Sequence, residues 1–238
     1  MDTQLQNKLL RLNLLDTTKL SQRALDYAIK GYRLGSPEFC RYVRRGDSQL
    51  SELRRRMTDL YPKLMMQQPS LASQSIGESA APSEVRFPFA ALRISSALHA
   101  ICTAATEIST FTMLLLEDAR VPVTAAVDKV CLLINRQMSL CIVALFKKEA
   151  SCAEMVLQAR GSRQLFDQAF HELRGDLRRR VAMPAALGMA IINTLIQIAG
   201  QIQEIAQAIL FWLKGGRLGE SPEVEKTQHF RLSSPITS

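Results

Sequence analysis

The chain has 238 residues, 47% of them hydrophobic, which is enough to bury a sizeable core and excludes disorder of the whole chain. Its 30 Lys and Arg against 22 Asp and Glu give a net charge of +8, which favours an acidic partner, a nucleic acid or an anionic lipid surface. Aromatic residues make up only 6% of the chain and are not interleaved with basic ones, so we expect no nucleic-acid binding.

The first half of the chain is predicted to be helical. Apolar residues recur at spacings of three and four, and two-residue alternation is nowhere sustained, which indicates an all-α protein. We predict one helix or a helix pair over residues 4–33, a break at residues 35–37, and a second helix from Pro37 to about residue 66. Residues 68–83, rich in Ser, Ala and Pro, predict a long solvated loop before a long helix over residues 88–119.

The second half is also predicted to be helical. Residues 121–124 (VPVT) mark a break, and residues 147–150 and 161–162 break or kink the helices that follow. The last long helix begins near Pro184 and ends at Gly215 and Gly216, a pattern typical of a glycine C-cap. Residues 216–238 are polar and contain proline and serine, so we expect a disordered tail.

The two long helices share one apolar pattern, 97 residues apart, with Glu107 matching Glu204. This spacing predicts a tandem repeat that divides the chain into residues 1–119 and 120–215, each with a buried stripe. The stripe positions are Leu98, Ile101, Ala105, Ile108, Thr112 and Leu115 in the first half, and Leu195, Ile198, Ile202, Ile205, Ile209 and Trp212 in the second.

A membrane helix is the alternative for the last apolar segment. Residues 181–203 contain no charge and are long enough to cross a bilayer. Against this, five amide or hydroxyl side chains in the segment would need partners in hydrocarbon, and the matching helix carries Arg93, His99 and Glu107. A soluble bundle explains both helices, and a membrane-associated helical component stays as the alternative.

The sequence shows no catalytic motif. It has no G-x-S-x-G, no phosphate-binding glycine loop, no C-x-x-C and no histidines at metal spacing, so we expect no enzyme and no cofactor. The five cysteines indicate reduced thiols in a cytosolic protein, and the N-terminus lacks a signal peptide pattern. Two arginine runs could bind phosphate groups or acidic protein surface, although a solvated helix face explains them as well. They are Arg54, Arg55 and Arg56, and Arg178, Arg179 and Arg180.

Residues 195–206, LIQIAGQIQEIA, resemble the motif L-E-R-I-G/A-D-H-A-x-N-I-A of the PhoU family of phosphate-uptake regulators, and the following AILFWLKGG is similar to that family's aromatic run ending in glycine. Residues 98–108, LHAICTAATEI, occupy the same place in the first half. The stretches RFPFAALRIS and SELRRRMTDLYPKLMMQQP resemble the approach to that helix and the family's second helix. The resemblance covers about residues 10–216 and implies a tandem pair of up-down three-helix bundles.

The resemblance also shows what this chain has lost. In the family the Glu and Asp of each motif help to hold metal ions, which need several converging carboxylate oxygens. Those positions are His99 and Thr103 in the first half and Ile196 and Gly200 in the second. We therefore expect no tightly bound metal. Asp47, Glu107 and Glu204 are weak candidate ligands, and a solvated or helix-pairing role explains the two glutamates better.

The function that the resemblance implies is regulatory. PhoU proteins dock to a phosphate transporter or a sensor kinase and restrain uptake or signalling when phosphate is plentiful, commonly as homodimers in the cytoplasm. We therefore expect a non-enzymatic cytoplasmic regulator with protein partners and peripheral contact with the inner face of the membrane. A general helical adaptor unrelated to phosphate is a further alternative.

Overall fold

The computed structural model describes residues 3–46, 52, 55, 59, 83–117, 125–159, 162–178 and 182–215. Every regular element in these residues is a helix, which confirms the all-α prediction. The helices are α1 (Thr3–Leu34), α2 (Pro37–Arg45), α5 (Ser83–Glu117), α6 (Ala125–Lys147), α7 (Ala150–Leu157), α8 (Ser162–Arg178) and α9 (Ala182–Lys214). The predicted loop up to residue 82, the predicted tail from residue 216 and Asp47 lie outside the described residues.

Two predicted boundaries of the first half are wrong. The second helix begins at Pro37 as predicted, but it stops at Arg45, where the Gly46 N–H donates to the Val43 carbonyl at 3.1 Å. Glycine disfavours helix continuation through its backbone entropy, and this local signal outweighs the apolar periodicity beyond it. The long third helix begins at Ser83, so Pro88 lies inside α5 instead of at its start.

The predicted breaks at residues 147–150 and before residue 162 are confirmed, and the predicted break at residues 121–124 lies outside the described residues. α6 ends at Lys147, α7 begins at Ala150 and α8 begins at Ser162. Lys148 has a φ of 57°, the left-handed conformation that lets the chain turn sharply between α6 and α7. α9 begins two residues before Pro184 and ends at a glycine cap, because Gly215 has a φ of 85° and its N–H donates to the Phe211 carbonyl at 3.0 Å.

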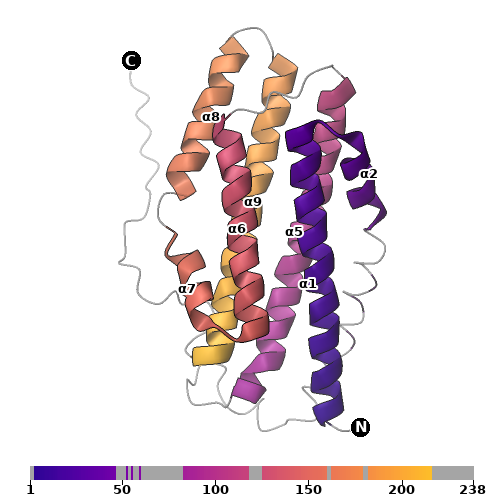
Figure 1. The fold of residues 1–238 in the computed structure, drawn as a ribbon, viewed down its shortest axis with the longest axis vertical. Coiled ribbons are helices and arrows are strands. Elements are labelled where there is room, and N and C mark those ends of the chain that lie inside the picture. The colour runs from indigo at the N-terminus through magenta and orange to yellow at the C-terminus, as the bar shows by residue number, and fades with distance from the viewer. Residues whose placement is uncertain are drawn as a thin grey trace, which may run out of the picture.

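The long helices α5 and α9 lie side by side at the centre of the bundle and run antiparallel (Figure 1). α1 packs parallel to α5, where the Ser21 hydroxyl donates to the Leu98 carbonyl at 3.1 Å. α6 packs parallel to α9 in the same way, and α2, α7 and α8 lie on the outside. Each half of the chain therefore has a first helix and a last helix that run in the same direction. Among the described residues, α2 lies between them along the chain in the first half, and α7 and α8 in the second.

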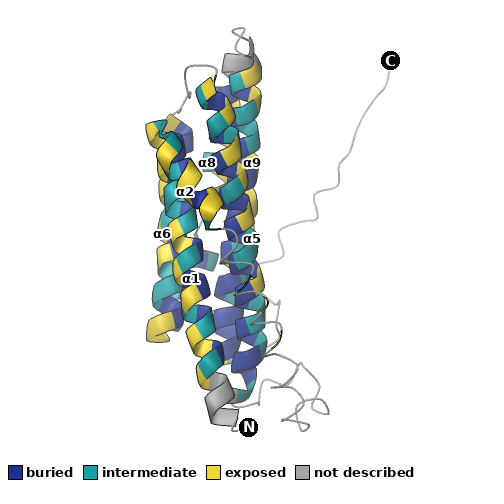
Figure 2. Cartoon of the chain, turned by 90° about the vertical axis from the view of Figure 1, so that its right-hand side faces the viewer, coloured by how far each residue is buried: buried dark blue, intermediate teal, exposed yellow. Residues whose placement is uncertain are grey.

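The predicted stripes form the core between α5 and α9. Every stripe position is buried, from Leu98 at 1% exposure and Ile101 at 0% to Ile209 at 0% and Trp212 at 5%. Figure 2 shows buried positions on the inner sides of the helices and exposed positions on their outer sides. One continuous hydrophobic core includes residues of both halves, so the division at residues 119 and 120 stays a prediction.

Three helices are long and apolar enough to cross a membrane by length and composition alone: Val85–Glu117, Ala125–Lys147 and Met183–Lys214. In the bundle, 50%, 44% and 50% of the residues in their most apolar windows are buried. The inward-facing half of each window therefore has a partner within the protein. Hydropathy alone therefore does not distinguish a lipid bilayer from the interior of a helical bundle for these helices.

Candidate functional surfaces

Of the four positions where the family motif has acids, Thr103, Ile196 and Gly200 are exposed on α5 and α9, whereas His99 is half-buried and its Nδ1 is buried. Thr103 is exposed, and its hydroxyl donates to the His99 carbonyl at 3.2 Å, one turn back on the same helix. Ile196 is 38% exposed, and a Cβ added to Gly200 would meet no atom within 4 Å. Among the described residues, no group of three or more His, Cys, Asp or Glu side chains could hold a metal ion.

Glu204 forms an ion pair between the two central helices. The Arg93 Nε donates to the Glu204 Oε2 at 2.8 Å and the Arg93 Nη2 donates to the same oxygen, and both side chains are half-buried. Glu107 occupies the matching place in the first half and is exposed. At the offset of 97 residues, the position equivalent to Arg93 is Ala190, which cannot supply a charge to pair with Glu107. The Arg93–Glu204 ion pair therefore has no equivalent between Glu107 and Ala190.

We expect the Arg93–Glu204 pair to contribute modestly to stability. Replacing either residue by alanine should lower the free energy of unfolding by less than about 1 kcal/mol, because solvent screens a half-exposed ion pair. A double-mutant cycle measured by urea denaturation isolates the coupling between the two side chains. Glu107→Ala is the matched control and should change little. A coupling well above about 1 kcal/mol, or one of unfavourable sign, would contradict this expectation.

A substitution at Gly200, in the middle of α9, is expected to stabilise the protein. Gly200→Ala should raise the free energy of unfolding by about 0.5 to 1 kcal/mol, because alanine reduces the backbone entropy lost in a helix and the site is open. Gly31→Ala provides the contrast, since its added Cβ would lie 2.7 Å from the Cys40 Sγ and should lower stability. Thermal denaturation of both variants measures the effect. Equal shifts of the melting temperature in Gly200→Ala and Gly31→Ala would contradict the prediction.

The arginine runs are only partly described. Arg55 is exposed and its guanidinium donates to both Glu52 carboxylate oxygens at 3.0 Å, with Asp59 at 3.6 Å. These neighbours partly neutralise its charge. Arg178 ends α8, and Arg54, Arg56, Arg179 and Arg180 lie outside the described residues. Partner binding by the arginine runs stays a prediction.

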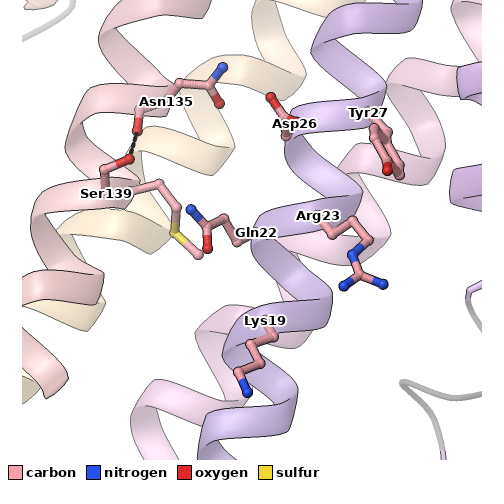
Figure 3. A pocket seen from close by; sticks show the side chains of 8 residues that line it. Lys19, Gln22, Arg23, Asp26, Tyr27, Asn135 and Ser139 are labelled. Atoms are coloured by element: carbon pink, nitrogen blue, oxygen red, sulfur yellow. Dashed lines mark hydrogen bonds between the residues drawn. The ribbon is translucent and has the colours of Figure 1, made fainter.

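A hollow of about 400 Å³ lies between α1 and α6. Figure 3 shows Gln22 and Asp26 of α1 facing Asn135 and Ser139 of α6, with Arg23 on the side away from α6. The Asp26 carboxylate already accepts a hydrogen bond from the Lys30 ammonium at 2.8 Å, and the Ser139 hydroxyl donates to its own helix at the Asn135 carbonyl. Two of the polar side chains that line this hollow are therefore already bonded within their own helices.

A second hollow, of about 260 Å³, lies at the end of the bundle where α1 and α5 begin and α6 and α9 end. We call it the end groove. The Arg11 guanidinium lies over the Phe87 ring at 4.9 Å, and the Lys148 ammonium lies over the Trp212 ring at 5.8 Å. The groove residues are Lys8, Arg11, Leu12, Leu14, Leu15, Phe87, Leu145, Phe146, Lys148 and Trp212.

The cysteines do not form a reactive site. All five are free thiols, and only Cys152 is more than slightly exposed. Burial raises the pKa of the Cys131 and Cys141 thiols to about 12, so both stay protonated at neutral pH. A protonated thiol is a poor nucleophile and a poor metal ligand.

The structure closely matches solved PhoU structures. The crystal structure of PhoU from Pseudomonas aeruginosa superposes with a TM-score of 0.79 at 16% sequence identity, covering 90% of this chain and 100% of the other. The chain has a PhoU-like fold. The phosphate transport system regulatory protein PhoU from Streptococcus pneumoniae matches with a TM-score of 0.75 at 15% identity, covering 90% and 98% of the two chains. No family model and no curated protein matches the chain by sequence.

The motif-like segments are residues 98–108 and 195–206, and their residue-by-residue match to the family motif stays a prediction. The two motif segments lie at the middle of α5 and α9, the helices that pair across the repeat. The end groove was missed by sequence analysis. Its only local signal is the placement of Lys8 and Arg11 among leucines of the first helix, and nothing in the sequence indicates that Phe146 and Trp212 come to lie beside them.

Proposed function

We propose that this protein is a non-enzymatic regulator that acts as PhoU proteins do, by docking to other proteins and modulating phosphate uptake or phosphate-responsive signalling. The observation that carries the proposal is the PhoU-like fold over 90% of the chain, shared with a protein described as a phosphate transport system regulator. The surfaces of the described residues are consistent with docking. They offer no cluster of potential metal ligands, and four of the five thiols are buried.

The proposed mechanism is surface complementarity. A net charge of +8 speeds the encounter with acidic surfaces, and contact residues at a bundle face then set the specificity. We propose a component of a phosphate transporter or a sensor kinase as the partner, a homodimer as the functional form, and the cytoplasm as the location, with peripheral contact at the inner face of the membrane. Since the motif acids are absent, this regulation does not depend on metal held at His99, Thr103, Ile196 or Gly200.

The test is deletion of the gene, with phosphate uptake and phosphate-responsive transcription measured in phosphate-rich and phosphate-poor medium. Loss of repression in rich medium, restored by the wild-type chain, would support the proposal. A Thr103→Ala chain should restore it equally, because that hydroxyl bonds only its own helix among the described residues. Wild-type uptake and transcription in both media would instead favour a helical adaptor unrelated to phosphate.

A membrane-associated component is a second candidate, because three helices are apolar enough to span a bilayer. Fractionation of cell membranes distinguishes a peripheral regulator from a membrane-inserted component. A bundle bound at the surface is released from membranes by salt, whereas an inserted helix is released only by detergent. Release by salt or recovery in the soluble fraction would reject insertion.

A further inference from the structure

The end groove has an apolar interior that opens to solvent. Trp212 is 5% exposed and lines the groove, while Leu12 and Phe146 at the same site are 49% and 45% exposed. Leu12 comes from α1 and Phe146 from the last turn of α6, so helices of both halves build the site. Large apolar side chains that are clustered and exposed beside a hollow are typical of an interaction surface.

Three cations line the same groove. Lys8, Arg11 and Lys148 line the groove, and none of them forms an ion pair with another described residue. Two are held in place, since Arg11 lies over the Phe87 ring and Lys148 lies over the Trp212 ring. A cation over a ring face keeps its remaining N–H donors available for carboxylate oxygens.

We propose that the end groove is a docking site for an acidic amphipathic segment of a partner protein. Apolar side chains of the segment would enter the hollow between Leu12, Phe146 and Trp212, and its carboxylates would pair with Lys8, Arg11 and Lys148. This is the helix-in-groove mode of recognition, in which apolar anchors supply affinity and flanking charges fix orientation. The proposal rests on the docking role proposed above and gives that role a surface.

The shape of the site favours a protein segment over a lipid surface. The groove is a depression of about 260 Å³ between the ends of helices, and a bilayer surface would contact its rim without filling it. Side chains projecting from a helix can enter such a depression. The cations come from two elements, Lys8 and Arg11 from α1 and Lys148 from the turn after α6. An amphipathic helix with carboxylates flanking its apolar row would present acidic groups to both elements.

The experiment uses the full chain and two synthetic helical peptides with the same leucine-rich face, one flanked by glutamates and the other by lysines. Trp212 is the only tryptophan, so its emission reports on the groove directly. We expect the acidic peptide to shift the Trp212 emission and to bind at least about tenfold more tightly than the basic peptide. Arg11→Glu and Lys148→Glu should each weaken the acidic peptide severalfold and strengthen the basic one.

Lys129→Glu is the matched control, since it makes the same charge change at an exposed position of α6 far from the groove. It should leave peptide binding close to wild type. Equal effects of Lys129→Glu and Arg11→Glu, equal binding of the two peptides, or no binding would overturn the proposal. Binding to vesicles of phosphatidylglycerol and phosphatidylcholine, lost in Arg11→Glu, without peptide binding would also overturn it in favour of lipid. These measurements do not involve phosphate, so their failure leaves the deletion test standing.

Discussion

Replacing Ile198 by alanine is expected to lower the free energy of unfolding by about 2 to 5 kcal/mol, the largest effect among the changes considered. Ile198 is 0% exposed and lies on the stripe of α9 that packs against α5 in the shared core. The substitution removes three buried carbon atoms, and the close-packed central pair can collapse only partly around the cavity. Urea denaturation followed by far-UV circular dichroism measures the change.

Ile196→Ala is the matched control for this prediction. It makes the same chemical change on the same helix two residues earlier, at a position that is 38% exposed, and should alter stability by no more than about 0.5 kcal/mol. A loss at Ile196 as large as that at Ile198, measured under conditions where the protein is a monomer, would contradict the exposed position of Ile196 on α9.

Replacing Arg86 by methionine is expected to cost about 2 to 3 kcal/mol. Arg86 is 9% exposed, and its Nε and Nη2 donate to the Trp212 carbonyl at 3.2 and 3.0 Å. Trp212 lies in the last turn of α9, where helix carbonyls lack regular helical partners and the helix dipole favours a cation. Methionine keeps most of the side-chain volume but leaves this buried acceptor without the two donors.

Arg11→Met is the control for Arg86→Met, because Arg11 is exposed and lies over the Phe87 ring in the same region. Its loss should cost about 1 kcal/mol or less. Urea denaturation gives both values, and Trp212 emission should change in Arg86→Met because the donors are removed from its own carbonyl. Equal losses in the two variants would show that the hydrogen bonds to Trp212 are not what stabilises this end of α9.

The sequence predicts the two buried stripes well, because apolar residues at helical spacing leave a strong periodic signal. Positions such as Ile101 and Ile198 recur at helical spacing in both halves, and apolar periodicity directly reports a buried helix face. Helix ends are predicted less well because single residues decide them. Gly46 ends α2 inside a segment whose periodicity continues, while Pro88, a common first-turn residue, lies within α5.

The contacts between helices could be predicted only in part. The sequence favours a solvated or helix-pairing role for Glu204, and the structure shows it paired with Arg93, 111 residues away. The identity of that partner depends on the antiparallel register of α5 and α9, which composition does not fix. The end groove was not predicted for the same reason, since Arg11, Phe146 and Trp212 meet only through the three-dimensional arrangement.

The antiparallel pairing of α5 and α9 has a consequence for stoichiometry. A strict repeat of 97 residues arranged in this way would have two equivalent ends, so a site built on the repeat alone would bind two copies of a partner. The residues at the groove end are not repeated at the other end. Arg86, Phe87 and Trp212 correspond, at the same 97-residue offset, to Met183, Pro184 and Leu115. An acidic segment that recognises the rings and cations would therefore bind once per chain, and titration calorimetry should give a ratio of one to one.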